Sequence, residues 1–430
     1  MVIVGSGPAG CLAGGLLAAK GYAVVMLEKA RFPRPHVGES LIPHFWKYTD
    51  LLGASEAIEK EGFVRKAGGT VIWNGAIRRM TFKDFGYERP ALHVERDRFD
   101  QILQEEAMAK GVQLVSPALA TRVEFGHAQG RQQVHVRIGK EPEESVIDCR
   151  YVMDASGQKT FLAQQLGLRE IDQQFRFFSV WGYYRNARYV AADGHAHDHG
   201  DLGRSPPTTF VTSLPDMADW GWSWHIPLRE STSVGLVVPM TEMAGFKAGG
   251  LSWPQWLDQK CRSTPVLQDL LADAELDGDG VGTIRDYSYR ATRTAGPGYF
   301  LLGDAAGFVD PIFSVGIVFS LYSAFSAAWA ANKCMQHPED SLRHQSLYDD
   351  QLRRRLEASR TLALPSYNPT EFLHEAVAAG IGFESLNEQA LMNVVATMTT
   401  RSGNFQSLQL EDAAVHSAAN KITKLDRIVY

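Results

Sequence analysis

The sequence predicts an α/β protein in which a doubly wound parallel-sheet unit is joined to an antiparallel sheet and a helical C-terminal region. Three observations predict this class. The chain opens with a strand, a glycine-rich turn, a helix and a second strand; its middle alternates aromatic and β-branched residues; and it is helical and amphipathic after residue 333. A length of 430 residues allows two or three domains with sizeable cores.

Composition and charge narrow the classes of partner. Hydrophobic residues make up 45% of the chain, charged residues 21%, and the formal net charge is −6. This charge gives no long-range attraction for nucleic acid or anionic lipid, so we expect neither as a partner. Cysteine usage is typical of structural thiols in a reducing compartment, which favours a cytoplasmic protein. The four cysteines are far apart, at Cys11, Cys149, Cys261 and Cys334.

The first thirty residues contain a dinucleotide-binding pattern. A β-branched strand is followed by G-x-G-x-x-G, an Ala/Leu-rich helix and a second strand, Ala23–Leu27, that ends at Glu28. The glycines allow a tight turn, close backbone approach to a pyrophosphate and helix packing on the sheet, while the acidic residue is placed for ribose binding. The residues expected to contact the dinucleotide are Gly5, Gly7, Pro8, Ala9, Gly10, Glu28 and Lys29.

Two later stretches favour FAD as the dinucleotide. "YVMDASGQ" (151–158) ends an apolar run at Asp154, and "YFLLGDAAGFVDPIFSVGI" (299–317) ends a strand at Gly303 and Asp304. An aspartate at a strand end can accept hydrogen bonds from ribityl or ribose hydroxyls. A helix beginning near Gly316 and Ile317 would aim its positive end at the flavin pyrimidine, where reduced flavin carries negative charge. Residues 311–332 are uncharged, but their four serines favour a buried core helix over a membrane span.

Together these stretches resemble the FAD-binding domain of flavoprotein monooxygenases of the hydroxybenzoate-hydroxylase type, a Rossmann-like fold, over roughly residues 1–330. "RPHVGESLIP" (34–43) is similar to the segment over the flavin, with Glu39 and Ser40 as polar contacts. "VERDRFDQIL" (94–103) is similar to an element whose arginine, here Arg98, reaches the FAD region. The alternative for Arg98 is a salt bridge to Asp97 or Asp100 on a helix surface. A separate nicotinamide site is not indicated.

The resemblance implies three regions. A discontinuous FAD-binding domain takes residues 1–62, 93–165 and 286–332; a substrate domain takes 63–92 and 166–285; and a helical region takes 333–430. The runs 176–184, 208–215, 220–227 and 232–240 predict an antiparallel sheet that would roof the flavin. Histidines 195, 197 and 199 alternate in a Gly/Asp-rich loop, where solvated side chains are more common than metal ligands, so no metal is expected.

"GWSWHIPL" (221–228) places two tryptophans two positions apart. In a strand, Trp222 and Trp224 share one face while Ser223 and His225 share the other, and Pro227 ends the ladder. One interpretation is a half-buried strand whose tryptophans fill a core. The other is a wall of stiff indoles that separates two compartments.

The set "GESLIP", "GWSWHIPL" and "DPIFSVGI" resembles the flavin-dependent halogenases. The short C-terminal tail favours their phenol- and pyrrole-type branch. This resemblance implies that Lys66, in "GFVRKAGGTVIWNG" (62–75), is the catalytic lysine, with Arg65 and Lys83 as lower-ranked candidates. Trp222 and Trp224 would then keep the substrate from the flavin, and the wall would also exclude water.

The implied chemistry uses FAD in reduced form, delivered by a separate NAD(P)H-dependent flavin reductase, together with dioxygen and chloride or bromide. Hypohalous acid would form near the flavin and be held by Lys66, because an ammonium in a partly desolvated wall can have a lowered pKa. Ser314, Val315 and Gly316 would hold the halide. The family commonly has two serines before this glycine, so Val315 is a departure that puts efficient chlorination in doubt.

The substrate would be a small electron-rich aromatic compound, free or carried on an acyl carrier protein. Two other readings stay open on the sequence alone. One is a flavin-dependent aromatic hydroxylase or a flavin reductase of the same fold. The other is a flavin-binding regulatory or redox-sensing protein, which would have no need of an aligned wall and lysine.

Overall fold

A computed structural model describes residues 1–367 except 74–75, 128–129, 142 and 215–220. Predictions for 368–430 lie outside the described residues. A six-stranded sheet forms the first layer, in the order β23-β24-β12-β1-β2-β8, and all of its pairs are parallel except β23–β24. Its strands are β1 (Val2–Val4), β2 (Val25–Leu27), β8 (Gln113–Val115), β12 (Val152–Asp154), β23 (Ala295–Gly296) and β24 (Tyr299–Leu301).

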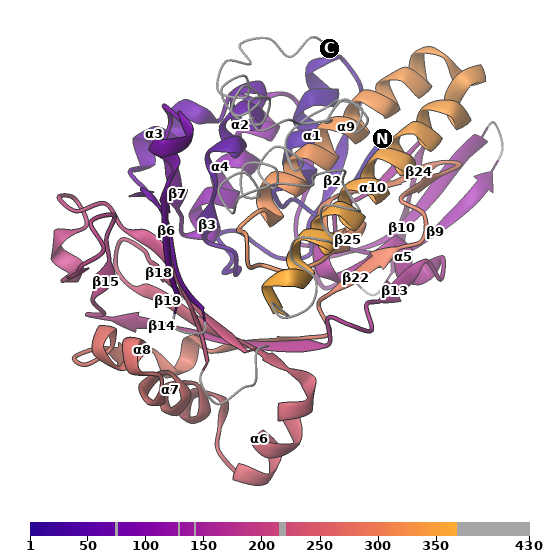
Figure 1. The fold of residues 1–430 in the computed structure, drawn as a ribbon. Helices are drawn as coiled ribbons and strands as arrows, with labels where there is room; N and C mark the ends of the chain where they lie inside the picture. The colour runs from indigo at the N-terminus through magenta and orange to yellow at the C-terminus, as the bar shows by residue number, and fades with distance from the viewer. Residues whose placement is uncertain (74–75, 128–129, 142, 215–220, 368–430) are drawn as a thin grey trace, which may run out of the picture.

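These strands are short apolar runs because helices and the three-stranded sheet of β9 (Ala118–His127), β10 (Arg131–Ile138) and β11 (Glu144–Cys149) bury them. β1 is buried at every position. The helices that join this core are α1 (Pro8–Ala19), α2 (Trp46–Leu52), α4 (Arg96–Ala109), α9 (Gly316–Gln336) and α10 (Ser341–Tyr367). Figure 1 shows α1, α9 and α10 gathered on the parallel sheet, with the ribbon of β9 and β10 projecting beside them. That ribbon is the antiparallel meander of β9, β10 and β11.

The uncharged stretch predicted as a core helix forms α9, which begins at Gly316 and has thirteen of its residues buried. Among the described residues, no helix is long and apolar enough to cross a membrane. All four cysteines are buried and free, as expected for structural thiols.

An eight-stranded sheet forms the second layer, and the four predicted antiparallel runs lie within it. The order is β20-β14-β19-β18-β17-β5-β6, with β21 paired to β14. Every pair is antiparallel except β17 with β5. The strands are β5 (Gly68–Trp73), β6 (Ala76–Thr81), β14 (Phe177–Arg185), β17 (Thr208–Ser213), β18 (Trp222–Pro227), β19 (Thr232–Pro239), β20 (Glu275–Leu276) and β21 (Gly282–Arg285).

The two faces of this sheet have different partners. One face packs with the helical segment α6 (Met243–Gly249), α7 (Trp253–Ser263) and α8 (Pro265–Leu270), which lies below the sheet in Figure 1. The other face packs against the loop that leads into α9. Because both faces are covered, β18 is buried at all six positions. The half-buried strand considered for "GWSWHIPL" is therefore wrong: Ser223 and His225 are as buried as the tryptophans.

A small antiparallel sheet bridges the two layers. It consists of β3 (Ser40–Leu41), β7 (Ala91–His93) and β4 (Val64–Lys66), with β7 in the centre. Its register pairs Ser40 with His93 and Lys66 with Ala91. This sheet brings residues from three separate stretches to one place. The remaining elements are α3 (Ser55–Glu61), α5 (Phe161–Gln165), β13 (Arg169–Ile171), β15 (Tyr189–Val190), β16 (Ala196–His197), β22 (Tyr289–Ala291) and β25 (Gly307–Phe308).

Candidate active site

The glycine loop after β1 has a geometry that only glycine permits at two positions. Gly5 has φ +102°, and a Cβ there would lie 2.4 Å from the carbonyl oxygen of Ala155. A Cβ on Gly10 would lie 2.0 Å from the carbonyl oxygen of Gly5. Pro8 and Ala9 form the buried first turn of α1, whose N-terminus has no side-chain cap. The turn therefore presents uncapped N–H groups at the carboxyl end of the sheet.

The space in front of Gly7 suits an anion. A Cβ on Gly7 would meet only the guanidinium of Arg34, at 3.5 Å, so the backbone is open on that side except for a cation. The carboxylate of Glu28 is buried and accepts hydrogen bonds from the amides of Ser6 and Ala30, both at 2.9 Å. Lys29 is exposed at the end of β2. These residues fit the pyrophosphate and ribose of FAD.

The second flavin stretch organises its own turn. Asp154 is fully buried, and its two carboxylate oxygens accept hydrogen bonds from the amides of Ser156 (2.9 Å) and Leu162 (2.7 Å). Burial raises the pKa of Asp154, and these hydrogen bonds work against the rise. The structure thus gives Asp154 a role in holding the loop that packs against Gly5.

The third stretch places a titratable carboxyl near the flavin segment. Gly303 has φ +54°, and a Cβ there would lie 2.7 Å from the hydroxyl oxygen of Ser320. Burial raises the pKa of the neighbouring Asp304 to about 6, although Arg96 and hydrogen bonds to Gln158 and Ser320 favour its charged form. Asp304 therefore titrates about one pH unit below neutrality and is mostly ionised at pH 7.

The arginine beside this group is Arg96, and the predicted Arg98 lies elsewhere. Arg96 is buried and makes a two-point ion pair with Asp100 at 2.8 and 2.9 Å. It also donates to the carbonyl oxygen of Val37 at 2.9 Å, which ties α4 to the 34–43 segment. Arg98 instead pairs with Glu61 at 2.9 Å on the partly exposed side of α4.

Glu39 and Ser40 lie in the same segment but have different partners. Glu39 is 1% exposed and accepts hydrogen bonds from the amide of Gly38 and the hydroxyl of Tyr183, both at 2.8 Å. Burial raises the pKa of Glu39. Tyr183 belongs to β14, so this contact fastens the flavin segment to the large sheet. Ser40 joins the lysine site described next.

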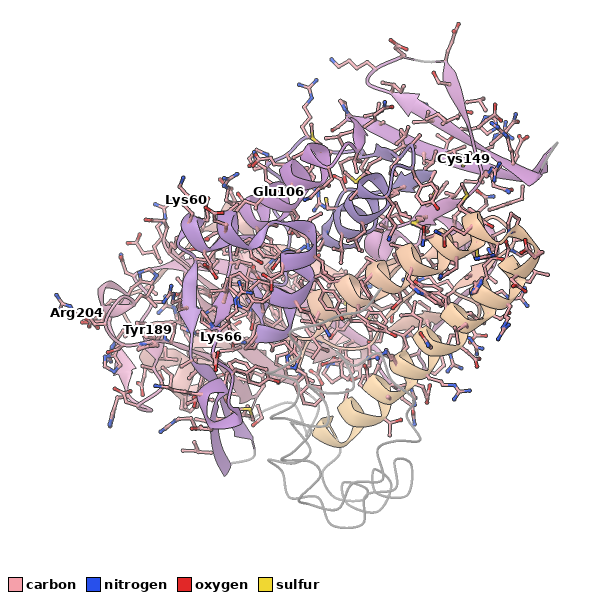
Figure 2. The ribbon with its side chains drawn as sticks, turned by 90° about the horizontal axis from the view of Figure 1, so that it is seen from above. Lys60, Lys66, Glu106, Cys149, Tyr189 and Arg204 are labelled. Atoms are coloured by element: carbon pink, nitrogen blue, oxygen red, sulfur yellow. The ribbon has the colours of Figure 1, made fainter. Side chains whose placement is uncertain are left out.

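Lys66 is a buried lysine with hydroxyl partners. It is 5% exposed, and Nζ donates to Ser40 Oγ at 2.6 Å and to Thr209 Oγ1 at 3.0 Å. Its ammonium also lies 5.4 Å from the centre of the Phe82 ring. Burial lowers the pKa of Lys66 to about 7. In Figure 2 Lys66 lies inside the outline of the molecule, whereas Arg204 projects from its edge. The lower-ranked candidates Arg65 and Lys83 are exposed.

The predicted halide segment is hydrogen-bonded to this lysine through one serine. Ser40 Oγ donates to Ser314 Oγ at 2.9 Å. Ser314 has φ +56°, an uncommon backbone conformation for a residue other than glycine. Val315 is the N-cap of α9, and Gly316 and Ile317 form its first turn. The segment therefore offers the N-terminal N–H groups of α9, and it is linked to Lys66 by two successive hydrogen bonds through the hydroxyls of Ser40 and Ser314.

The two tryptophans share one face of β18, as predicted, and that face is directed at the halide segment. Trp222 and Trp224 are 2% and 7% exposed, with ring centres 6.1 Å apart. They belong to a cluster with Phe308, Val309, Ile312 and Phe313, which lead into α9. Trp224 Nε1 donates to Ser233 Oγ at 3.2 Å. The indole of Trp224 lies over Gly235, where a Cβ would come within 2.2 Å of the ring.

Sequence reasoning missed five residues that the structure places in these contacts: Arg34, His93, Arg96, Tyr183 and Thr209. Arg34, His93 and Arg96 lie in or beside quoted motifs, so proximity was an available signal. Tyr183 and Thr209 lie in ordinary-looking strands and carry no local signal. Two histidines of 194–201 have hydrogen-bond partners outside this loop: His197 bonds the nearby Asp193 at 2.8 Å, and His199 bonds the carbonyl oxygen of the distant Leu228 at 3.0 Å.

Comparison with known proteins identifies relatives of this arrangement. The FAD binding domain family matches residues 1–354. The tryptophan 2-halogenase of Chondromyces crocatus is 35% identical over 332 residues, which are 76% of this chain and 60% of that protein. The 1H-pyrrole-2-carbonyl-(peptidyl-carrier protein) chlorinase of Pseudomonas fluorescens is 33% identical over 348 residues, 75% of this chain and 73% of that protein.

A solved structure of a flavin-dependent halogenase also resembles this chain. The flavin-dependent halogenase CmlS superposes with a TM-score of 0.75 at 27% identity, covering 99% of this chain and 77% of CmlS. The chain spans about three fifths of the length of the tryptophan 2-halogenase. The similarity thus extends over the flavin-binding layer and the large sheet.

Proposed function

Because the chain belongs to the flavin-dependent halogenases, we propose that it forms hypohalous acid from reduced FAD, dioxygen and chloride or bromide and delivers the halogen through Lys66 to an electron-rich aromatic substrate, a phenol or a pyrrole. The observation that carries this proposal is the position of Lys66. It is a buried lysine whose partners are hydroxyls, and one of those hydroxyls bonds the segment that begins α9.

Reduced FAD would supply the two electrons that activate dioxygen for oxidation of the halide. The chain's own contribution begins with binding. The loop of Gly5, Gly7 and Gly10 would hold the pyrophosphate, with Arg34 beside it and Glu28 at the ribose. Arg96 and Asp100 would hold the 34–43 segment in place over the flavin. Glu39, Asp304 and the first turn of α9 would complete the pocket, and Asp154 would hold the loop behind it.

Lys66 suits the transfer step because its pKa of about 7 makes both protonation states available at neutral pH. As an ammonium it would donate a hydrogen bond to hypohalous acid. As a neutral amine its lone pair would attack the halogen: the N–halogen bond forms, the halogen–oxygen bond breaks, and the hydroxide leaves as water with an amine proton. A ring carbon of the substrate would then attack the halogen and return the electron pair to nitrogen; the ring carbon loses its proton, and the nitrogen takes up one proton to restore the neutral amine.

The indoles of Trp222 and Trp224 would keep the substrate from the flavin. They fill the space between the large sheet and the loop that leads into α9, and they leave little exposed surface there. A substrate held beyond them would meet the small halogen electrophile but not the flavin itself. The same packing would exclude water, which would otherwise consume the oxidant.

Val315 bears on the choice of halide. As the N-cap of α9 it keeps its backbone N–H donor but offers no hydroxyl, so Ser314 is the serine of this segment that faces Ser40. Halide binding would then depend on backbone N–H groups and Ser314. Bromide, which is the easier halide to oxidise, is the better first reagent.

Two partners belong to this proposal. A separate NAD(P)H-dependent flavin reductase would supply reduced FAD. A carrier protein would present the substrate, since the name of the Pseudomonas fluorescens chlorinase gives its substrate as a pyrrole held by a peptidyl-carrier protein. A free phenol is the alternative substrate form.

The test uses the full chain with FAD, a flavin reductase, NADH, oxygen, bromide and phloroglucinol as a free electron-rich phenol. We expect bromide-dependent brominated product, and a loss on the order of 100-fold or more in Lys66→Met with FAD binding retained. The control is Lys83→Met, a change at an exposed lysine close by in sequence. Hydroxylated phloroglucinol formed without any bromide requirement would contradict the proposal and favour the hydroxylase reading.

A further inference from the structure

A buried histidine with a fixed partner lies behind the lysine. His93 is fully buried, and its Nδ1 is 3.0 Å from the carbonyl oxygen of Pro227, the last residue of β18. A carbonyl oxygen only accepts hydrogen bonds, so Nδ1 must carry the hydrogen. Burial lowers the pKa of His93, and the nearby Lys66 lowers it further, so the ring is neutral. Its Nε2 is then a bare acceptor.

The hydroxyl of Thr209 completes the chain of bonds. His93 Nε2 is 2.8 Å from Thr209 Oγ1. Since Nε2 carries no hydrogen, Thr209 must donate its single hydrogen to His93. Thr209 Oγ1 therefore accepts a hydrogen bond from Lys66 Nζ at 3.0 Å. Toward Ser40 Oγ, at 2.9 Å, it can accept but not donate, and it accepts there only when Ser40 turns its single hydrogen away from Ser314 Oγ.

This direction restricts Lys66. The hydroxyl of Ser40 donates one hydrogen, and it has two acceptors for that hydrogen besides Lys66. These are Ser314 Oγ and Thr209 Oγ1, each at 2.9 Å, and Ser40 bonds one of them at a time. A neutral Lys66 therefore donates one of its two N–H groups to Ser40 Oγ and the other to Thr209 Oγ1. Its lone pair has to point away from both hydroxyls. An ammonium form would leave its third N–H in that same direction.

We propose that His93 and Thr209 are positioning residues for Lys66: through them the carbonyl of Pro227 fixes the direction of the hydrogen bonds, so that the amine lone pair is held free for the incoming halogen. The inference rests on the proposed function of Lys66 as the halogen carrier. It also gives the end of "GWSWHIPL" a role, because the backbone carbonyl of Pro227, the last residue of the tryptophan strand, becomes the anchor of the lysine. Thr209 and His93 touch Lys66 or its partner and are not themselves placed on the reacting atoms.

The first test measures the tautomer of His93 without any turnover. The full-length protein is labelled with 15N-histidine, and the His93 ring signals are assigned with a His93→Gln variant. We expect a neutral ring with the hydrogen on Nδ1 throughout pH 6–8, which is the less common tautomer in water. A ring protonated on Nε2, or one that becomes charged in this range, would overturn the proposal.

The second test separates positioning from folding. Thr209→Val removes the hydroxyl, Thr209→Ser restores it, and Thr212→Val is the control, since Thr212 is a buried threonine of the same strand whose hydroxyl bonds the carbonyl oxygen of Ser213. We expect about 10-fold or more slower bromination of phloroglucinol in Thr209→Val, with undiminished hypobromous acid trapped in bulk by a 1,3-diketone. Thr209→Ser should lie within about threefold of the wild type.

Two results of the second test would contradict the proposal: Thr209→Ser as slow as Thr209→Val, or Thr209→Val as fast as the wild type and Thr212→Val. If the wild-type protein makes neither brominated phloroglucinol nor trapped hypobromous acid, the proposed function fails instead. The tautomer of His93 then still decides whether the hydrogen-bond direction was correctly inferred.

Discussion

The glycine loop and the lysine site are built in opposite ways. The loop is a six-residue stretch whose geometry is set by its own backbone, because Gly10 packs directly on Gly5. The lysine site joins Ser40, Lys66, His93, Thr209 and Ser314, and its bonds connect residues between 26 and 274 positions apart. A motif whose residues are contiguous in the sequence can be identified from the sequence alone, since its spacing and residue types are visible there. A site assembled by sheet pairing is recognisable only at the residue with the unusual chemistry, here the lysine.

The largest expected effect is at the loop. Gly10→Val would place a side chain 2.0 Å from the Gly5 carbonyl oxygen, where neither backbone can yield without opening the turn. We expect a loss of roughly 4 kcal/mol in the free energy of unfolding and no retained FAD on purification. Denaturant unfolding and flavin fluorescence measure both. Gly245→Val, at an exposed position with open space around it, is the control, and equal losses in the two variants would contradict a local cause.

The second prediction compares two arginines of one helix. Arg96→Ala would leave the buried Asp100 with only the more distant Arg34, at 3.8 Å, as a cationic partner, so we expect about 3 kcal/mol lower stability and weaker FAD binding. Arg98→Ala removes a partly exposed pair with Glu61 and should cost about 0.5 kcal/mol. Urea unfolding and FAD titration of both variants test the contrast. FAD binding lost only in Arg98→Ala would restore the sequence-based assignment.

The third prediction concerns the tryptophan wall. Gly235→Ala would put a methyl group within 2.2 Å of the Trp224 ring and force the indole off the sheet. We expect a cost of about 1–3 kcal/mol and a changed tryptophan fluorescence spectrum. Gly69→Ala, on β5 of the same sheet, is the control because its nearest neighbours are 3.8 Å or more away. An unchanged spectrum in Gly235→Ala would mean that Trp224 is not held by this contact.

The last prediction is a pH dependence of stability from Lys66, whose effect within any one pH unit is small. Its pKa is about 7 in the folded protein and near 10.5 when unfolded, so the unfolded chain binds more protons between these values and stability rises with pH there. Relative to Lys66→Met, the wild type should gain at most about 1.4 kcal/mol per pH unit from pH 7 to 9. Urea unfolding at pH 7, 8 and 9 measures this gain. A constant difference between the two proteins would show that Lys66 stays charged.

The arginines show how far sequence reasoning reaches. The element "VERDRFDQIL" correctly marks a helix that carries an arginine toward the flavin segment. Two positions along a helix correspond to a rotation of about 200°, so Arg96 and Arg98 point to nearly opposite sides. Which side faces the sheet depends on how α4 packs, and nothing in the ten letters fixes that packing. The tryptophans differ, since strand alternation alone puts them on one face, but only the covering helices explain why Ser223 and His225 are buried as well.

The sequence by itself determined the dinucleotide turn, the strand–helix order of the flavin layer, the helix beginning at Gly316, the antiparallel runs and the lysine worth examining. The lysine was singled out by the resemblance to a known family; each of the others depends on local periodicity or on glycine stereochemistry, which neighbours along the chain fix. Only the tertiary structure decided that Arg96 and not Arg98 approaches Asp304, and that Ser40, His93 and Thr209 surround Lys66. Those contacts arise from the pairing of β3, β4 and β7 and the packing of β17 beside them. Long-range pairing of this kind leaves no periodic trace in the sequence.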